Sequence, residues 1–215
     1  MSERRSPTSS IIRPRLRGVA DIYAATAAVP AAIALVASAR PGATRLAVLV
    51  YAASLVVLLV GSAIYHRPYW PLRTALLLRK IDHANIYFLI AGTCTPLAVL
   101  LGDDGPWLLT VMWSAAGLGV LKTFLWPRAP RTANSALYVV MGLLTLPCVP
   151  SLYAAGGGSF PLLALGGLFY LVGAVVYALR RPNPAPAVFG YHEIFHLFVF
   201  AAAACHFLAI WNLTT

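Results

Sequence analysis

Seven long apolar runs restrict the fold of this chain more than any other feature of its sequence. Each is about 20 residues long and almost free of charge, which is the length that a helix needs to cross a hydrocarbon layer of roughly 30 Å. Hydrophobic residues make up 60% of the 215 residues and charged residues 10%. That is far more apolar surface than a water-soluble domain of this size could bury. We therefore predict an all-α, polytopic membrane protein.

The predicted architecture is one bundle of seven transmembrane helices. Short connections rich in Gly and Pro separate the apolar runs, and the sequence shows neither a soluble domain nor an obvious internal repeat. A basic tail, residues 1–17, precedes the transmembrane domain, residues 18–215. The expected spans are residues 19–39, 46–65, 82–101, 106–126, 134–153, 160–179 and 188–211.

The basic residues predict how the bundle lies in the membrane. Fourteen of the sixteen Lys and Arg fall in the tail or in and beside every second connection, whereas Arg40 and Arg45 fall in the first connection. Cytoplasmic segments are enriched in Lys and Arg, so we expect the N-terminus in the cytoplasm and the C-terminus outside. This topology, with contact to anionic lipid head groups, explains the net charge of +10 without nucleic acid as a partner.

The motif HEIFH, which begins at His192, fits the HExxH pattern of zinc metalloproteases. His192 and His196 are four residues apart, so they share one helical face and can ligate one metal ion. No Asp or Glu follows Glu193 to serve as the protease's third ligand, and His206 lies about 15 Å further along the same helix. An intramembrane protease would have to take Asp82 as its ligand, which makes it the less favoured alternative.

Other polar side chains are expected at the depth of this histidine pair. The alternation of spans places His66 at the end of the second span and Asp82 at the start of the third, both at the cytoplasmic boundary. Ser62 lies one helical turn before His66 on the same face. We therefore predict a zinc ion ligated by His66, His192 and His196. Three histidines leave the fourth position of a tetrahedral zinc open, which is typical of a catalytic site.

The remaining ionisable residues of the spans have less specific predictions. His83 is expected at the boundary, because it lies about 100° around the helix from its neighbour Asp82. His206 is expected to hydrogen-bond between helices, and Asp21 either does the same or pairs with a basic residue of the cytoplasmic side. Glu193 either faces the cytoplasm or acts as a favourable anion near the N-terminus of its helix.

Three stretches of the chain resemble the hemolysin III family, whose relatives include the progestin and adipoQ receptors and the alkaline ceramidases. They are GSAIYHR with Ser62 and His66, KIDHANIYFLIAGTCTPL with Asp82, and HEIFHLFVFAAAACHFLA with the histidine pair. The resemblance covers nearly all of the chain after residue 46. It implies seven membrane helices with zinc held by the three histidines, while Asp82 and Ser62 contact the water on the metal.

The first span departs from the family pattern. Many members carry a Glu, an Asn and a Thr-His pair there, whereas this chain keeps only Asp21 and Thr26. The resemblance therefore implies no role for this stretch.

Two classes of function follow. In the first, the protein is a zinc-dependent hydrolase of lipid amides or esters, with Asp82 as the general base and Ser62 as the residue that orients the attacking water. The resemblance to ceramidases implies a fatty amide substrate. In the second class the zinc is structural, and the protein is a cytolytic pore-former, a transporter or a regulator of membrane state. Membrane lipids are the expected partners, and the resemblance implies the plasma (inner) membrane of a bacterium.

Overall fold

The computed structural model describes residues 14–215, and this part of the chain is helical apart from connections and one isolated β-bridge. Seven of its helical segments are long and apolar enough to cross a membrane. The predicted all-α, seven-span fold is thereby confirmed, whereas residues 1–13 of the predicted basic tail lie outside the described residues. In chain order the helices are α1 (Val19–Ser38), α2 (Ala43–His66), α3 (Leu72–Leu100), the 3₁₀ turn η1 (Gly102–Asp104), α4 (Gly105–Leu125), α5 (Arg131–Leu143), the 3₁₀ turn η2 (Leu146–Cys148), α6 (Val149–Gly156), α7 (Phe160–Leu179) and α8 (Tyr191–Thr214).

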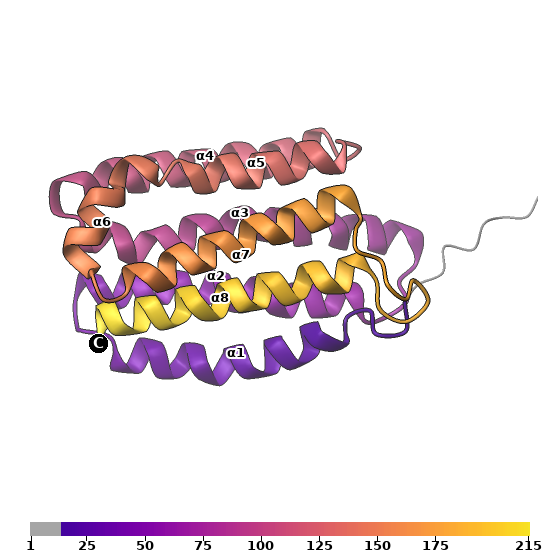
Figure 1. The fold of residues 1–215 in the computed structure, drawn as a ribbon, viewed down its shortest axis with the longest axis horizontal. Helices are drawn as coiled ribbons and strands as arrows, with labels where there is room; N and C mark the ends of the chain where they lie inside the picture. Colours follow the sequence, from indigo (N-terminus) through magenta and orange to yellow (C-terminus); the bar gives the residue numbers. More distant parts are fainter. Residues whose placement is uncertain (1–13) are drawn as a thin grey trace, which may run out of the picture.

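The helices lie roughly along one direction and form an elongated bundle (Figure 1). Consecutive helices pack as neighbours in the pairs α1–α2, α2–α3, α3–α4 and α7–α8, and contacts between α1 and α8 bring the first and last helices together. The end of α2 and the starts of α3 and α8 lie at the same end of the bundle, opposite the C-terminus (Figure 1). We call this the histidine end, because His66 closes α2 there and His192 lies in the first turn of α8.

The third span is longer than the sequence indicated. Helix α3 begins at Leu72, ten residues before the expected start at Asp82, and so takes in most of the stretch that we had assigned to a link. The stretch carries three basic residues, which made it resemble a connection, but four of its other residues are Leu. These residues are strong helix formers, and the charged side chains can reach the boundary while their stems stay in apolar surroundings.

The fifth span is broken in two. Helix α5 ends at Leu143 and α6 begins at Val149, with η2 between them. Pro147 lies inside this break and Pro150 in the first turn of α6. A proline has no backbone N–H to donate and clashes with the preceding turn, so it interrupts a helix. The two pieces together still form one apolar span, Arg131–Gly156.

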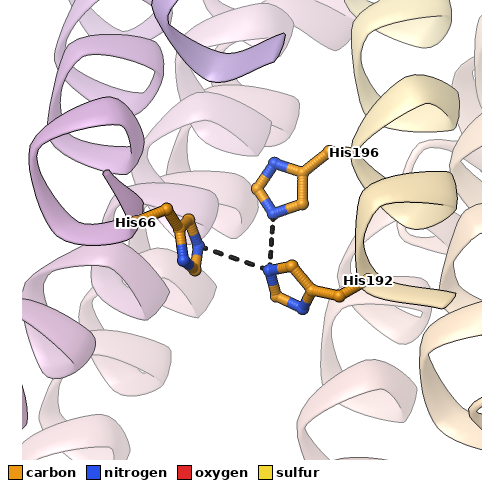
Figure 2. Close-up of side chains that lie close together, drawn as sticks. All are labelled: His66, His192 and His196. Atoms are coloured by element: carbon orange, nitrogen blue, oxygen red, sulfur yellow. Dashed lines mark hydrogen bonds between the residues drawn. The ribbon is translucent and has the colours of Figure 1, made fainter. Parts of the chain in front are cut away.

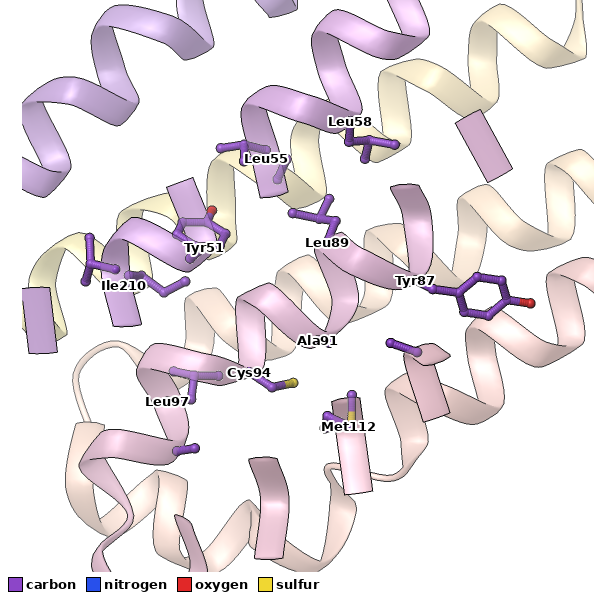
Figure 3. Close-up of a cluster of buried hydrophobic side chains, with 14 of the residues drawn as sticks. Tyr51, Leu55, Leu58, Tyr87, Leu89, Ala91, Cys94, Leu97, Met112 and Ile210 are labelled. Atoms are coloured by element: carbon purple, nitrogen blue, oxygen red, sulfur yellow. The ribbon is translucent and has the colours of Figure 1, made fainter. Parts of the chain in front are cut away.

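The bundle is held together by an apolar cluster between α2, α3, α4 and α8 (Figure 3). Tyr51 of α2, Tyr87 of α3 and Ile210 of α8 are almost completely buried in it. In a bilayer the hydrophobic effect does not drive helices together, so close packing holds them, and small residues allow the helices to approach. Gly119 of α4 is the clearest case, because a Cβ atom there would lie 2.4 Å from the ring of Tyr87.

Candidate metal centre

Three histidines meet at the histidine end of the bundle. His66 is the last residue of α2, and His192 and His196 lie one turn apart at the start of α8. Their rings turn toward one another from the two helices (Figure 2). The Nε2 atoms of His192 and His196 are 2.8 Å apart, and those of His66 and His192 are 3.4 Å apart. One ring nitrogen of each histidine lies within 4.8 Å of the corresponding nitrogens of the other two. This group could therefore hold one metal ion.

Asp21 of α1 orients one of these rings. Its Oδ1 lies 2.7 Å from Nδ1 of His196 and also accepts a hydrogen bond of 2.9 Å from the hydroxyl of Ser62. Both Asp21 and Ser62 are buried. A histidine that donates Nδ1–H to a carboxylate keeps a lone pair on Nε2, and metal-ligating histidines are commonly oriented in this way. The donor set therefore fits a metal ion.

Sequence reasoning did not assign Asp21 to the site. The expected contact of Asp21 with other helices is present, and its partners are two residues of the site, His196 and Ser62. One signal could have found it, since a carboxylate within a membrane span is costly and marks function by default. The first span begins at the same end of the bundle as the histidine group.

Asp82 of α3 lies beside the group. Its Oδ2 is 3.9 Å from Nε2 of His66, and the residue is buried. The structure therefore brings together all five residues that we had selected: Ser62, His66, Asp82, His192 and His196. The roles that we predicted for Asp82 and Ser62 stay predictions.

Glu193 has structural partners. Its Oε2 accepts a hydrogen bond of 2.8 Å from the backbone N–H of Gly190, which caps α8. Its Oε1 lies 3.7 Å from a guanidinium nitrogen of Arg17. Of the two interpretations that the sequence left open for Glu193, this geometry supports the helix-terminal anion.

Arg17 also contacts the histidine group, because its Nε donates a hydrogen bond of 3.1 Å to Nδ1 of His66. A neutral imidazole that accepts at Nδ1 carries its proton on Nε2. Ligation through Nε2 of His66 therefore requires Arg17 to release Nδ1. The carboxylate of Glu193 is near enough to pair with the guanidinium of Arg17 after that release.

The other two histidines lie outside the group. His206 forms the expected interhelical hydrogen bond, since its Nε2 lies 3.1 Å from the backbone oxygen of Leu163 in α7. His83 follows Asp82 on α3, and its backbone oxygen accepts a hydrogen bond of 3.3 Å from the Tyr138 hydroxyl of α5.

A cavity of about 1410 Å³ connects this group with the interior of the bundle. At the histidine end its wall includes His66, Asp82 and His196. It extends past His206 to Leu108 and Phe160, which lie near the starts of α4 and α7 at the opposite end. Most of the deep lining is apolar, so a long hydrocarbon chain could lie in the cavity with its polar end at the histidines.

Comparison with known proteins shows which proteins this chain resembles in sequence. Residues 9–207 match the family described as Haemolysin-III related. The chain is 34% identical to Hemolysin-3 of Bacillus cereus over 188 residues, which cover 85% of this chain and 83% of that protein. It is 31% identical to the human Monocyte to macrophage differentiation factor over 169 residues, 76% of this chain and 68% of that protein. With ADIPOR-like receptor IZH2 of Saccharomyces cerevisiae it shares 27% identity over 184 residues, 76% of this chain and 58% of that protein.

Proposed function

This chain belongs to the haemolysin-III-related family of membrane proteins, and we propose that it is a zinc-dependent hydrolase of lipid amides. One observation supports this proposal most directly. Three imidazoles and the buried carboxylate of Asp82 meet where a long, mostly apolar cavity reaches the end of a membrane bundle. We assign the protein to a bacterial plasma membrane, because the Bacillus cereus relative is the most similar in sequence of those described above.

His66, His192 and His196 would hold the metal, and Asp21 would keep Nε2 of His196 directed at it. Three imidazoles with an open fourth position are typical of catalytic zinc, although copper, iron and nickel also accept imidazole ligands. When bound, the ion supplies a Lewis acid that polarises a substrate carbonyl and makes water more acidic.

Asp82 is the proposed general base. Its carboxylate is near enough to the histidine group to accept a proton from a water molecule as the oxygen of that water attacks the amide carbon. When the C–N bond breaks, Asp82 returns the proton to the leaving amine, so the products are a fatty acid and an amine. The hydroxyl of Ser62 gives its hydrogen to Asp21, which leaves its lone pairs to accept a hydrogen bond from the same water.

Metal analysis and lipid hydrolysis test the proposal on the purified protein. We expect about one zinc per chain, lost in both His66→Ala and His196→Ala. His206→Gln should keep the metal, because His206 lies about three helical turns from the group. Asp82→Ala should keep the zinc and release fatty acid from lipid amides about 10²–10⁴-fold more slowly. Zinc retained in His66→Ala would contradict the three-histidine site and favour the HExxH protease arrangement.

Membrane lysis by a protein with structural zinc is the second candidate function, and the name Hemolysin-3 of the Bacillus cereus relative favours it. It predicts leakage of a trapped dye from vesicles that contain the purified protein. Vesicles that stay sealed would exclude this function. Sealed vesicles, bound zinc and no fatty acid released from a broad lipid panel would instead favour a non-enzymatic transporter or regulator.

A further inference from the structure

Arginines surround the cavity where it reaches the histidine end. Arg79 of α3, Arg128 of the α4–α5 connection and Arg131 at the start of α5 all line it. We call these three residues the arginine mouth. Arg17 lines the cavity as well, but it already contacts Glu193 and His66.

Carboxylates of the described residues do not balance the charge of the arginine mouth. Among residues 14–215, two acidic residues line the cavity: Glu193, which faces Arg17, and Asp82, which lies beside His66. Within residues 14–215, none of the three mouth arginines forms an ion pair. A net positive entrance therefore leads to a mostly apolar interior.

Much of the hydrogen-bonding capacity of the mouth is also unused by the protein. A guanidinium has five N–H donors. Arg79 donates one hydrogen bond of 3.2 Å to the backbone oxygen of Pro127, and Arg131 donates one to the hydroxyl of Tyr191. The arginines at the opposite end use more of their donors. Arg40 donates to the backbone oxygens of Leu213 and Thr214. Arg45 donates twice to the backbone oxygen of Ala39.

The arginine mouth is near the histidine group. The guanidinium of Arg131 lies 5.7 Å from the ring centre of Tyr177, whose own ring centre is 5.9 Å from that of His192. One aromatic ring thus separates the two sites. A charged group a few bonds from an amide could reach the arginines while the amide lies at the histidines.

General attraction to a negatively charged membrane explains basic residues at this end of the bundle. It does not explain why the three residues of the arginine mouth line the cavity. Arg180 and Arg181 follow α7 at the same end and are absent from the cavity wall, so they provide a matched comparison.

We propose that the arginine mouth binds an anionic group, carboxylate or phosphate, on the amine side of the lipid amide, and thereby selects lipids with a charged head group over neutral ones. Guanidinium groups form bidentate, charge-assisted hydrogen bonds with both anions. The assignment of these lipids as substrates rests on the proposed hydrolysis, whereas their binding does not.

Equilibrium binding of two matched lipids tests the proposal. N-oleoylglycine carries a carboxylate where N-oleoylethanolamine carries a neutral hydroxyl-bearing carbon, and both have the same acyl chain. Binding is measured to the full chain in neutral detergent, with Asp82→Asn present in every sample to prevent turnover. We expect N-oleoylglycine to bind about tenfold more tightly, since charged hydrogen bonds are roughly twice as strong as neutral ones.

The variants separate the mouth from general surface charge. Arg128→Gln combined with Arg131→Gln should lower the preference to about twofold or less, with unchanged affinity for N-oleoylethanolamine as evidence that the cavity is intact. Arg180→Gln combined with Arg181→Gln should keep the preference. Equal binding of the two lipids by the parent protein, or equal loss in both double variants, would overturn the proposal.

Two further results keep the conclusions distinct. Sodium phosphate should displace N-oleoylglycine no better than sodium chloride of equal ionic strength; selective displacement would assign the mouth to a soluble anion instead of a lipid. If the preference is measured but no lipid amide of a broad panel is hydrolysed, the proposed function fails while the binding site stands. Hydrolysis of both lipids at equal rates with equal affinity would do the reverse.

Discussion

At the scale of single residues, the site depends on side chains that mean little alone. The carboxylate of Asp21 links two buried side chains. It accepts a hydrogen bond from the hydroxyl of Ser62 and contacts the imidazole of His196. An unpaired carboxylate at this depth would be costly, so its persistence in a membrane bundle depends on both partners. The same contacts hold one ring nitrogen available for a metal ion.

Asp21 should therefore control metal affinity. Asp21→Ala leaves Nδ1 of His196 without its acceptor, and we expect zinc affinity to fall about 10–100-fold, as for other residues that orient a metal ligand. Asp21→Asn should lose less, because the amide oxygen can still accept from Nδ1–H. Titration against a competing chelator measures the affinity. Asp103→Ala, at an exposed acid of η1, is the control, and an affinity unchanged in Asp21→Ala would refute the orienting role.

At the scale of helices, close packing positions the site. The site lies where α1, α2, α3 and α8 meet, and small residues let such helices approach. Gly117 and Gly119 of α4 show the contrast, because a Cβ atom at Gly117 would meet nothing within 4 Å, whereas one at Gly119 would overlap the ring of Tyr87. Tyr87 is only 2% exposed and packs against Tyr138, so it has little space to move.

Alanine at these two glycines should have opposite effects. Gly119→Ala should lower the free energy of unfolding by about 1–3 kcal/mol, the usual range for overpacking a core. Gly117→Ala should be neutral or slightly stabilising, since alanine has the higher helix propensity. Chemical unfolding in detergent compares the two. Equal effects would show that α3 and α4 adjust to the added methyl group.

At the scale of the whole molecule, the two ends of the bundle differ in chemistry. The histidine end has the histidine group, the arginine mouth and the entrance of the cavity, whereas the opposite end has Arg40 and Arg45 near the C-terminus. By the distribution of basic residues, the histidine end should face the cytoplasm.

Cysteine labelling in intact cells can establish this orientation. With the three native cysteines replaced by serine, a membrane-impermeant maleimide added outside should label Thr215→Cys directly. It should label Arg181→Cys only after the membrane is permeabilised, because positive connections are retained in the cytoplasm. Labelling of Arg181→Cys in sealed cells would reverse the proposed topology.

The number of spans, the helical class and the pairing of His192 with His196 follow from the sequence alone. These are local properties, because a bilayer needs about 20 apolar residues per helix and residues four apart share a face. Even local prediction failed where two signals competed, as between the basic residues and the helix propensity before Asp82. In the α5–α6 segment the signals also compete, because one continuous apolar run favours a single helix whereas Pro147 and Pro150 interrupt it.

The sequence placed Ser62, His66 and Asp82 at the depth of the histidine pair, but only the tertiary structure decided their contacts and added Asp21 to the group. Ser62 and Asp21 are 41 positions apart, and His66 and His192 are 126 apart. Such contacts depend on how far each helix is rotated about its axis and on its depth against its neighbours, which the packing of the whole bundle sets. In the folded bundle Asp21 is the partner of a candidate metal ligand, Glu193 caps a helix, and the three residues of the arginine mouth line the cavity.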